Sequence, residues 1–310
     1  MTLVSIVTPS YNQAAYLEQT IRSVLDQDTR ELEYLVVDGG SDDGSIDIIR
    51  RYEGRLAWWA SEKDSGQAEA INKGMRRARG EIVAWLNSDD TYLPGAIRDA
   101  VQAFATHPQA VLVYGDMRAV DERGAPINVL RYRQLTLEDL LCFQIIGQPA
   151  VFMRRSAFEA VGGLDLSYHF MLDHQLWIKL AQLGPIVHVD RLWAQARYHP
   201  HAKNRAQATG FAREALRLLD WAETEPSLAS TLQHVSRRAK AAAQRVNARY
   251  LLDDGQSRAA LQAWGRAFAL HPPTALRRMN LLASAMLNLA GLGAVRKAVL
   301  ELRRRRLNKS

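Results

Sequence analysis

A polar run with possible metal-binding chemistry, Asn87-Ser-Asp-Asp90, directly follows the apolar segment Glu81–Leu86. Adjacent carboxylates repel each other, and their desolvation is unfavourable unless a positive charge is near. In one interpretation, these residues form a solvated turn that caps the next helix, with Pro94 in the first turn. In the other, they bind a hard divalent cation such as Mg²⁺, which takes one or two carboxylates together with substrate phosphates.

Two more polar segments have side chains suited to binding a ligand. Asp38-Gly-Gly-Ser-Asp-Asp-Gly44 follows the apolar run Glu33–Val37, and its glycines permit a tight turn and the close approach of a ligand. An ordinary strand-to-helix loop is the alternative, because the segment matches no known glycine-rich phosphate-binding motif. In the segment Ser61–Gly74, Asp64 and Lys73 are either solvated or turned toward a ligand, with Lys73 reaching a phosphate.

The elements that must position these residues alternate between strand-like and helix-like patterns. Short β-rich apolar runs indicate strands, and apolar residues at helical spacing separate them. This alternation predicts an α/β fold with a mostly parallel sheet covered by helices on both faces. Ligands bind such sheets outside the carboxyl ends of the strands, so Pro9-Ser10, Asp38-Gly39 and Asn87–Asp90 should converge at one edge. The predicted strands are residues 3–7, 33–37, 56–60, 81–86 and 110–114, and the clearest predicted helices are 16–25, 67–79 and 173–183.

Composition limits the class of protein. The chain has 310 residues, 47% of them hydrophobic and 24% charged, which is enough for a large core and for two domains. The only cysteine, Cys142, excludes an internal disulfide and fits a reducing compartment. The first residues read as a strand and lack the pattern of a signal peptide, so we expect a cytoplasmic protein. The net charge of +7 favours an anionic partner.

The sequence predicts three regions. Residues 1–115 and 116–205 form the two expected halves of one α/β domain. Residues 206–310 read as helix almost throughout, and within them 250–272 resemble one tetratricopeptide-type unit. Residues 279–295 carry no charge but are fewer than the ~20 needed to span a bilayer. With Arg303–Arg306 and Lys309 after them, they form either an interfacial helix on an anionic membrane or a packed helix with a solvated basic end.

An ordered series of motifs resembles the family 2 glycosyltransferases of GT-A fold, which have a Rossmann-like sheet. The resemblance covers roughly residues 3–205. It implies that residues 1–115 are the nucleotide-sugar-binding half of the domain and that 116–205 are its acceptor-binding and catalytic half. The segments that carry it are Val4–Asn12, Val37–Ser45, Ser61–Gln67, Ala70–Gly74, Asn87–Asp90 with Tyr92–Pro94, Ile146–Phe152, Val161–Asp165 and Leu172–Trp177.

The resemblance implies a role for individual residues. Asn87-Ser88-Asp89 occupies the position of the family's Asp-x-Asp motif, so Asp89 is the expected ligand of a Mg²⁺ or Mn²⁺ ion that bridges the donor diphosphate. His199 falls where related enzymes carry a late histidine near the diphosphate, and it is the second expected metal ligand. Asp173 matches the catalytic base. The expected nucleotide-binding residues are Pro9, Ser10, Tyr11, Asn12, Asp38, Asp64, Lys73, Asn87 and Ser88.

The sequence departs from the family pattern at four positions. Asn87 replaces the first acid of Asp-x-Asp and brings no charge to the metal site. Gly39 replaces a second aspartate that often reads the base or ribose, which leaves the nucleotide open. Leu172 and Gln175 replace acids on either side of Asp173, and neither change removes Asp173 itself.

The chemistry implied is the transfer of a sugar from a nucleoside diphosphate to an acceptor hydroxyl. A cation offsets the charge that develops on the leaving diphosphate, and a carboxylate opposite it takes the acceptor's proton. In-line attack of this kind inverts the anomeric centre. The alternative interpretation of Asp173 is an N-cap for the helix that follows, since aspartate is a favoured cap. His174, His188 and His201 match no motif, and we interpret them as surface or locally bonded residues.

We therefore expect a cytoplasmic inverting glycosyltransferase, with peripheral attachment to the inner face of the membrane left open. Its expected partners are a UDP-, GDP- or dTDP-sugar and a saccharide or lipid-linked acceptor of cell-surface polysaccharide or glycoconjugate synthesis. A nucleotidyltransferase and a non-catalytic nucleotide-sugar-binding protein remain as alternatives, and Asn87 and Leu172 favour the second. A nucleic-acid binder is not expected, because the basic residues match no recognised module.

Overall fold

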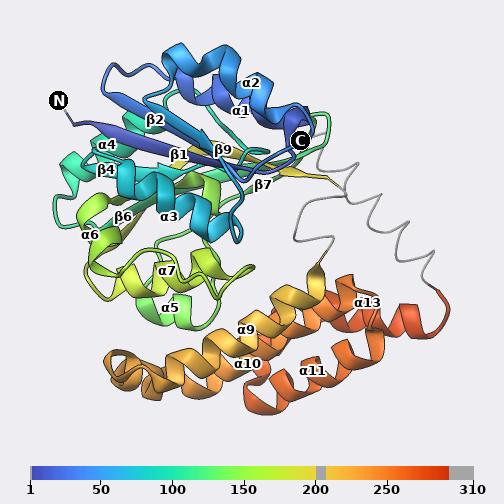
Figure 1. Cartoon of the computed structure of the whole chain (residues 1–310). Coiled ribbons are helices and arrows are strands. Elements are labelled where there is room, and N and C mark those ends of the chain that lie inside the picture. Colours follow the sequence, from blue (N-terminus) through green and yellow to red (C-terminus); the bar gives the residue numbers. More distant parts are fainter. Residues whose placement is uncertain (1, 200–206, 293–310) are drawn as a thin grey trace. The chain divides into compact units, whose positions relative to one another are not determined.

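The computed structural model describes residues 2–199 and 207–292, which form two compact units (Figure 1). The α/β unit comprises Met1–Leu135 and Ile146–Tyr198, and the helical unit comprises Thr136–Ile145 and His199–Ser310. The segment Thr136–Ile145 thus groups with the helical unit, although the sequence patterns place it in the middle of the α/β domain. The division of the α/β unit into nucleotide-binding and acceptor-binding halves stays a prediction.

The α/β unit is built on one mixed, mostly parallel sheet. Within the described residues the sheet has nine strands, in the order β3-β2-β1-β4-β8-β6-β9-β5, with β7 paired to β6. Strands β3, β2, β1 and β4 are parallel, whereas β8 runs antiparallel between β4 and β6. The strands are β1 (Val4–Ser10), β2 (Leu32–Asp38), β3 (Trp58–Ser61), β4 (Ile82–Trp85), β5 (Thr91–Tyr92), β6 (Leu112–Asp121), β7 (Pro126–Leu130), β8 (Val151–Arg154) and β9 (Ile186–Tyr198).

Helices cover both faces of this sheet, as predicted. Helices α1 and α2 lie on one side, and α3 and α7 lie on the other (Figure 1). The predicted helices 16–25, 67–79 and 173–183 are confirmed with shifted ends. The helices of the unit are α1 (Ala14–Leu25), α2 (Ser45–Tyr52), α3 (Gln67–Arg77), α4 (Ala96–Thr106), α6 (Arg155–Ala160) and α7 (Leu172–Ala181).

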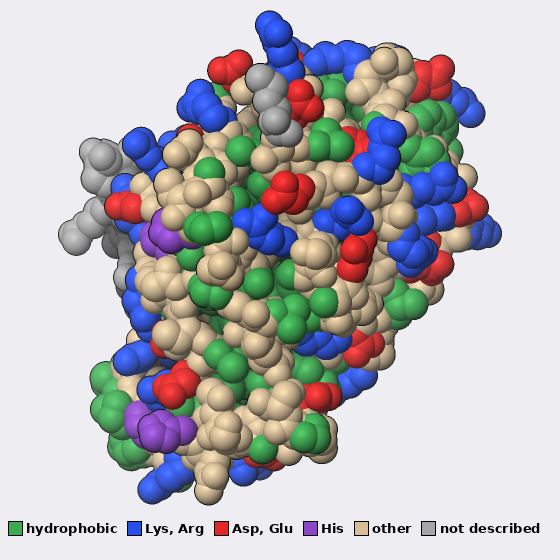
Figure 2. Space-filling model, turned by 90° about the vertical axis from the view of Figure 1, so that its left-hand side faces the viewer, with side chains coloured by type: hydrophobic (Ala, Val, Ile, Leu, Met, Phe, Trp, Pro, Cys, Tyr) green, Lys and Arg blue, Asp and Glu red, His purple; other side chains and the backbone are tan. Residues whose placement is uncertain are grey.

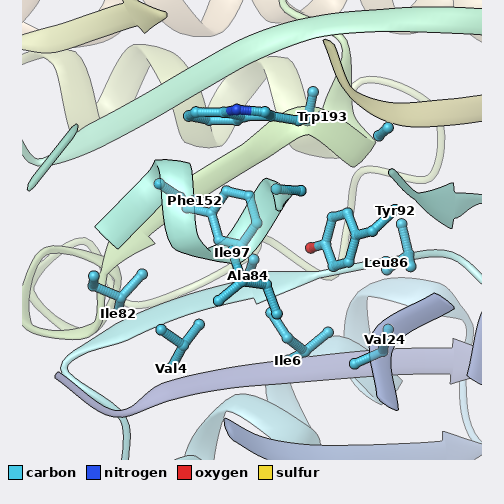
Figure 3. Close-up of a cluster of buried hydrophobic side chains, with 14 of the residues drawn as sticks. Val4, Ile6, Val24, Ile82, Ala84, Leu86, Tyr92, Ile97, Phe152 and Trp193 are labelled. Atoms are coloured by element: carbon cyan, nitrogen blue, oxygen red, sulfur yellow. The ribbon is translucent and has the colours of Figure 1, made fainter. Parts of the chain in front are cut away.

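The main core lies between the sheet and helices α1, α2 and α4. Side chains from strands that are far apart in sequence meet there (Figure 3). The Phe152 ring stacks on Tyr92, with 5.4 Å between ring centroids, and meets Trp193 edge-on at 5.6 Å. This cluster connects β8, β5 and β9. These strands therefore pack in the same hydrophobic core as β1, β2 and β4.

On the opposite face, helix α3 packs directly on the sheet at Gly74. A Cβ atom at this position would lie 2.9 Å from Cγ2 of Val7 and 3.2 Å from Cγ2 of Val37. Only glycine fits so close to two β-branched side chains of a packed strand pair. At the start of the same helix, Gln67 donates to Asn87, which follows β4.

A buried acid, Glu33, links three segments at the other end of the sheet. Its carboxylate accepts hydrogen bonds from the Ser5 hydroxyl at 2.5 Å, from the Arg79 backbone N–H at 2.7 Å and from the Arg79 guanidinium at 2.6 Å. Burial acts to raise the pKa of Glu33, but these hydrogen bonds and the Arg79 charge outweigh it and hold the pKa below its usual value of 4.5.

This network predicts a specific acid sensitivity. A carboxyl whose pKa is lowered on folding stabilises the fold above its unfolded pKa, and this contribution is lost as the pH falls through the folded pKa. We expect Glu33→Gln to lower the free energy of unfolding at neutral pH by about 1 to 2 kcal/mol and to flatten its decline below pH 4.5. Denaturant titrations between pH 3 and 7, with Glu159→Gln as an exposed control, measure this effect. Parallel pH curves for wild type and Glu33→Gln would contradict the assignment.

The helical unit consists of antiparallel helices rich in small side chains. Its longest helices are α9 (Ala208–Thr224) and α10 (Ala229–Asp253), and the Phe211 and Tyr250 rings on them stack with centroids 4.7 Å apart. Gly255, with φ +82°, forms the turn that reverses the chain after α10. The other helices are α5 (Leu137–Leu141), α11 (Ser257–Leu270), α12 (Pro272–Leu276) and α13 (Met279–Leu289).

Two predictions concern membrane contact. In the described part of the chain, no helix is long and apolar enough to cross a bilayer. The end of the uncharged run 279–295, together with Arg303–Arg306 and Lys309, lies outside the described residues. Figure 2 shows one face of the molecule, on which basic and acidic side chains intermingle, so the excess of positive charge is not collected there in one patch.

Candidate active site

Strand pairing brings polar residues into one row at the carboxyl ends of β1, β2 and β3. Ser10 lies opposite Asp38, and Asp38 lies opposite Ser61. The Asp38 carboxylate is fully buried and accepts hydrogen bonds from Gly40 N, Ser41 N, Ser41 Oγ and Ser61 Oγ at 2.6 to 3.0 Å. Asp38 therefore organises its own loop, and its contact with a nucleotide stays a prediction.

Ser10 differs from its neighbours in the row because its hydroxyl is not used by the fold. Its side chain is 4% exposed, and Oγ has no hydrogen-bond partner among the described residues. Buried polar groups are nearly always bonded, and an exception at a ligand-binding edge suggests a missing partner. This observation fits the predicted role of Ser10 in binding a ligand, and Pro9 lies buried directly before it.

Asn12 joins the loops that follow β1 and β2. It has φ +51°, a left-handed conformation that asparagine tolerates better than most residues. Its backbone N–H donates to Ser41 Oγ at 2.8 Å, and its Oδ1 accepts from Asp42 N at 3.0 Å. The adjacent Tyr11 is 63% exposed. Its ring therefore lies at the surface of this edge and does not pack in the core.

Asp64 lies against the backbone of Gly39. A Cβ atom at position 39 would be 3.0 Å from Oδ2 of Asp64, and the other carboxylate oxygen accepts from Gly66 N at 2.9 Å. The absence of a side chain at Gly39 thus makes room for the Asp64 carboxylate at this edge of the sheet. Lys73 on α3 forms an ion pair with Glu62, which follows β3.

A chain of amides holds Asn87. Its Oδ1 accepts from Gln67 Nε2 at 2.6 Å, and its Nδ2 donates to Gln148 Oε1 at 3.1 Å. Gln148 in turn donates through Nε2 to the backbone oxygen of Trp85 at 2.8 Å. An aspartate at position 87 would direct a carboxylate oxygen at the Gln148 oxygen. An amide at position 87 therefore fits this network, whereas an aspartate would not. Both glutamines lie in segments that carry the family resemblance, but neither was assigned a role from the sequence.

The turn Asn87–Asp90 does not cap a helix, so that interpretation is wrong. Strand β5 follows it directly, and α4 begins only at Ala96, with Gly95 at its N-cap and Pro94 before it. Instead, the Thr20 hydroxyl donates to the backbone oxygens of Ser88 at 2.9 Å and Asp90 at 2.7 Å. The turn is thus fixed mainly through its backbone.

A buried arginine on β9, Arg197, also holds the turn Asn87–Asp90 in place through hydrogen bonds. Its Nε donates to the backbone oxygen of Asp89 at 3.1 Å, and its own N–H donates to Oδ1 of Asp90 at 2.9 Å. Its remaining donors reach Gln19 and the backbone oxygens of Asp121 and Glu122. No motif pointed to Arg197, because its partners lie more than 70 residues away along the chain.

The two carboxylates of the turn have different surroundings. Asp90 is buried, and burial together with the Asp89 charge raises the pKa of Asp90 well above its usual value. Asp89 is only half-buried. Asp90 therefore stabilises the turn itself, and the role of Asp89 as a metal ligand stays a prediction.

The residues present fit a cation that shares its ligands with a substrate. Within the described ranges, no group of three or more His, Cys, Asp or Glu side chains gathers around a common point. A cation held entirely by such side chains is therefore not built into this part of the chain. One half-buried carboxylate at the sheet edge matches Mg²⁺ or Mn²⁺ sites in which phosphates supply the other oxygens.

Asp173 is the second residue of α7, so its interpretation as an N-cap is wrong. Met171 occupies the N-cap, and its side chain makes no capping hydrogen bond. Asp173 lies in the first turn, where the helix dipole favours a negative charge, and its Oδ1 accepts from His174 N at 2.7 Å. One turn further along, Trp177 stacks on Trp85 of β4 with 5.4 Å between centroids. This buried pair fixes α7 against the strand that leads into Asn87–Asp90.

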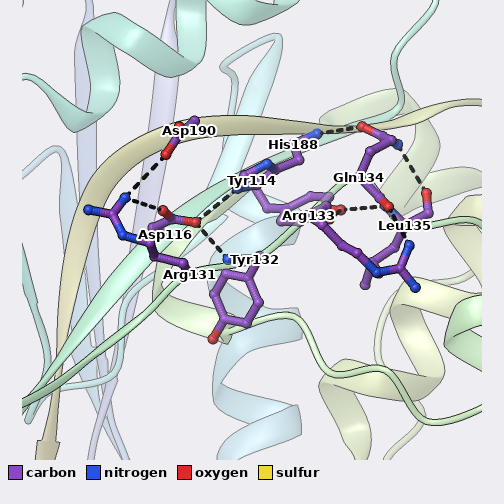
Figure 4. Close-up of polar contacts among 9 residues, drawn as sticks. All are labelled: Tyr114, Asp116, Arg131, Tyr132, Arg133, Gln134, Leu135, His188 and Asp190. Atoms are coloured by element: carbon purple, nitrogen blue, oxygen red, sulfur yellow. Dashed lines mark hydrogen bonds and ion pairs between the residues drawn. The ribbon is translucent and has the colours of Figure 1, made fainter.

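A polar cluster around Asp116 fixes the segment that carries Tyr132 (Figure 4). The buried Asp116 carboxylate accepts from His188 Nε2 at 2.9 Å, from Tyr132 N at 2.9 Å and from Arg131 Nη1 at 3.4 Å. Burial, and then the charges of Tyr198, Asp116 and Asp173, raise the pKa of Tyr132. Tyr132 thus lies in the electrostatic field of Asp173 and stays a neutral phenol.

The structure tests the interpretation of His188 but not the role predicted for His199. His188 is half-buried and bonded to Asp116, which confirms it as a locally bonded residue. His199 directly follows β9 and is 2% exposed, and its role as a metal ligand stays a prediction. His201 lies outside the described residues.

Comparison with known proteins agrees with this arrangement. The family model for glycosyl transferase family 2 matches residues 5–162. TuaG of Bacillus subtilis, which is assigned to teichuronic acid biosynthesis, is 32% identical over 188 residues, covering 59% of this chain and 73% of TuaG. An uncharacterized glycosyltransferase of Rickettsia conorii is 29% identical over 207 residues, which cover 64% of this chain. This match spans only about a third (34%) of the Rickettsia protein.

Solved structures show the same fold. S. aureus TarS, residues 1–349, superposes with a TM-score of 0.61 at 19% identity, covering 98% of this chain and 91% of that chain. The mannosyltransferase PcManGT from Pyrobaculum calidifontis, in complex with GDP-Man and Mn²⁺, gives 0.62 at 22% identity, covering 93% and 87%. The molecule therefore has the GT-A type of α/β fold with an all-helical C-terminal region. The chain belongs to glycosyl transferase family 2.

Proposed function

We propose that this chain is an inverting glycosyltransferase that moves a sugar from a nucleoside diphosphate to an acceptor hydroxyl. The observation that carries the proposal is the turn Asn87–Asp90, which places the half-buried Asp89 at the carboxyl edge of the sheet. Ser10, whose buried hydroxyl has no partner among the described residues, lies at the end of β1, next to β4. A metal-bound diphosphate is the ligand that this edge fits best.

In this proposal Asp89 holds a Mg²⁺ or Mn²⁺ ion together with the donor diphosphate, with His199 as a second ligand. When bound, the cation offsets the negative charge that develops on the leaving nucleoside diphosphate. Asn87 and Ser88 shape the turn that presents Asp89, because their own polar groups are engaged by Gln67, Gln148 and Thr20.

The remaining edge residues bind the nucleoside. Tyr11 offers an exposed aromatic ring for stacking, while Pro9 and Asn12 fix the backbone around it. Asp38 and Asp64 provide acceptors for donors of the base or ribose, and Asp64 lies in the space that Gly39 leaves open. Lys73 exchanges its ion pair with Glu62 for a donor phosphate.

Asp173 takes the proton of the acceptor hydroxyl as this oxygen attacks the anomeric carbon from the side opposite the leaving group. The position of Asp173 at the N-terminal turn of α7, fixed through Trp177 and Trp85, supplies a rigidly held carboxylate. Attack from this side inverts the anomeric configuration.

The names of the relatives support a saccharide product, but they differ in the polymer and in the donor sugar, so they do not identify either for this chain. TuaG is assigned to teichuronic acid biosynthesis, and the chondroitin synthase of Escherichia coli is 28% identical over 193 residues. Donors seen with structural relatives are UDP-GlcNAc, with TarS, and GDP-Man. We propose a comparable role in cell-surface polysaccharide or glycoconjugate synthesis, on the cytoplasmic side of a membrane.

A protein that binds the nucleotide sugar without turnover is the second candidate. It is favoured by the uncharged amide network of Asn87, which leaves fewer carboxylates for a catalytic metal. This candidate predicts donor binding with no release of nucleoside diphosphate.

A thermal-shift panel tests donor binding and its dependence on a divalent cation. UDP, GDP, dTDP, CDP and NAD are each added with Mn²⁺, Mg²⁺ or EDTA, because a ligand that binds only the folded state raises the melting temperature. We expect one nucleoside diphosphate to raise it with a divalent cation and to have no effect in EDTA. No shift with any diphosphate and metal would contradict the donor site.

A further inference from the structure

One tyrosine of the α/β unit has a hydroxyl proton that the fold does not use. Tyr132 is half-buried, and its ring packs against the main core. Its backbone N–H donates to Asp116 Oδ1 at 2.9 Å, whereas its ring points away from Asp116 (Figure 4). In the described part of the chain, no group accepts the proton of the Tyr132 hydroxyl. Buried and half-buried hydroxyls usually have such a partner.

The backbone on either side of Tyr132 is held in place, although residues 131–136 belong to no helix or strand. The Tyr114 hydroxyl donates to the backbone oxygen of Arg133 at 2.7 Å and accepts from Leu135 N at 2.9 Å. Together with the bond from Tyr132 N to Asp116, these contacts fix the segment before any ligand binds. A side chain fixed in this way loses little conformational entropy when it contacts a ligand.

The Tyr132 hydroxyl lies against the backbone of Gly147. A Cβ atom at position 147 would clash with Oη of Tyr132 and with Sδ of Met117. Gly147 has φ −73°, which any residue adopts, so it is this close contact that favours a glycine. Burial raises the pKa of Tyr132, and a contact of the Gly147 N–H with the phenol oxygen opposes this rise. The oxygen thus faces a donor, and its own proton is left for another acceptor.

The surroundings of Tyr132 belong to the candidate active site. Gly147 directly precedes Gln148, which accepts from Asn87 Nδ2 at 3.1 Å in the turn Asn87–Asp90. Asp173 is near enough for its charge to act on the Tyr132 phenol. In the proposed reaction the transferred sugar lies between the metal-bound diphosphate and the base. Tyr132 therefore has a neighbour from each side of that position.

We propose that the Tyr132 hydroxyl donates a hydrogen bond to a hydroxyl group of the transferred sugar, an inference that rests on the proposed function. The phenol stays neutral and keeps its proton, and sugar hydroxyls are acceptors as well as donors. A site that bonds a substrate hydroxyl discriminates against sugars that lack this group or carry it in another orientation. Tyr132 thus helps to select the donor sugar, in addition to packing against the core.

Tyr132→Phe tests the inference, because it removes only the oxygen and keeps the packed ring. Calorimetric titrations in Mn²⁺ compare UDP, GDP and dTDP with UDP-Glc, UDP-GlcNAc, GDP-Man and dTDP-Glc. We expect the variant to bind the nucleoside diphosphate like wild type and the matching nucleotide sugar about 3- to 10-fold more weakly. Its melting temperature without ligand should not fall, because no hydrogen bond between described residues is lost.

Two other tyrosines provide matched controls. The Tyr52 hydroxyl on α2 donates to Glu18 Oε1 at 2.9 Å, and Tyr52→Phe should bind both kinds of ligand like wild type. Tyr114→Phe removes the bond to Arg133 O and should lower the melting temperature, as a purely structural change does.

The outcomes separate this inference from the proposed function. Wild-type affinity of Tyr132→Phe for the nucleotide sugar would overturn the inference and leave the proposed function intact. An equal loss of affinity for the diphosphate and the nucleotide sugar would do the same, because it would show that the sugar is not what the hydroxyl contacts. If wild type bound no diphosphate or no nucleotide sugar, the proposed function would be wrong, and this inference with it.

Discussion

Asp89→Asn should lose metal-dependent donor binding and reduce the rate of sugar transfer by about 100-fold or more. The substitution keeps the size of the side chain and removes the charge that would hold the cation. The fold should be unaffected, because Arg197 and Thr20 fix the turn through the backbone oxygens of Ser88, Asp89 and Asp90. Donor binding is measured by the melting-temperature shift with nucleoside diphosphate and Mn²⁺, and transfer by release of nucleoside diphosphate.

Asp90→Asn is the matched control, since it neutralises the adjacent carboxylate of the same turn. The amide oxygen of the new side chain can still accept the hydrogen bond that Arg197 N donates to Asp90 Oδ1 at 2.9 Å. We therefore expect the metal-dependent shift of this variant to stay close to that of wild type. If Asp89→Asn kept the shift, or if Asp90→Asn lost it to the same extent, the assignment of Asp89 as the metal ligand would be wrong.

Asp173→Asn should lower the turnover rate by roughly 10² to 10⁴-fold while leaving donor affinity unchanged, because a general base acts on the acceptor and not on the nucleotide. The amide keeps the shape of the side chain and can still accept from His174 N. Initial rates over a range of donor concentrations separate the turnover number from the Michaelis constant.

A structural role for Asp173 would give a different pattern. If Asp173 only oriented α7, its asparagine variant should lower the melting temperature and change both kinetic constants moderately. An Asp173→Asn variant with wild-type turnover would exclude the residue as the base. Activity lost together with the metal-dependent shift would instead place Asp173 in the donor site.

The parallel half of the sheet was predictable because its signals are local. Each of β1, β2 and β4 is a short apolar run, and a turn rich in polar residues or glycine follows each of them. Parallel strands put these turns at one edge, and the register confirms that Ser10 and Asp38 are neighbours. The α/β class and the family followed from the same local motifs.

The contacts that hold the site together were not predictable, since they join residues far apart in sequence. Asn87 meets Gln148 across 61 positions, and Arg197 meets Asp90 across 107. They depend on β8 entering antiparallel between β4 and β6 and on β9 pairing with β6, and no local pattern specifies such pairings. Both capping interpretations failed for a related reason, because local propensity did not show where α4 and α7 begin.

The most direct test of the central claim is a crystal structure of the chain grown with Mn²⁺ and the nucleoside diphosphate that stabilises it. Anomalous scattering locates the Mn²⁺ independently of the surrounding atoms. The account predicts one Mn²⁺ coordinated by a carboxylate oxygen of Asp89 and by the diphosphate, with the nucleoside beside Tyr11 and Asp38. Mn²⁺ bound elsewhere, or a diphosphate bound away from the turn Asn87–Asp90, would contradict it.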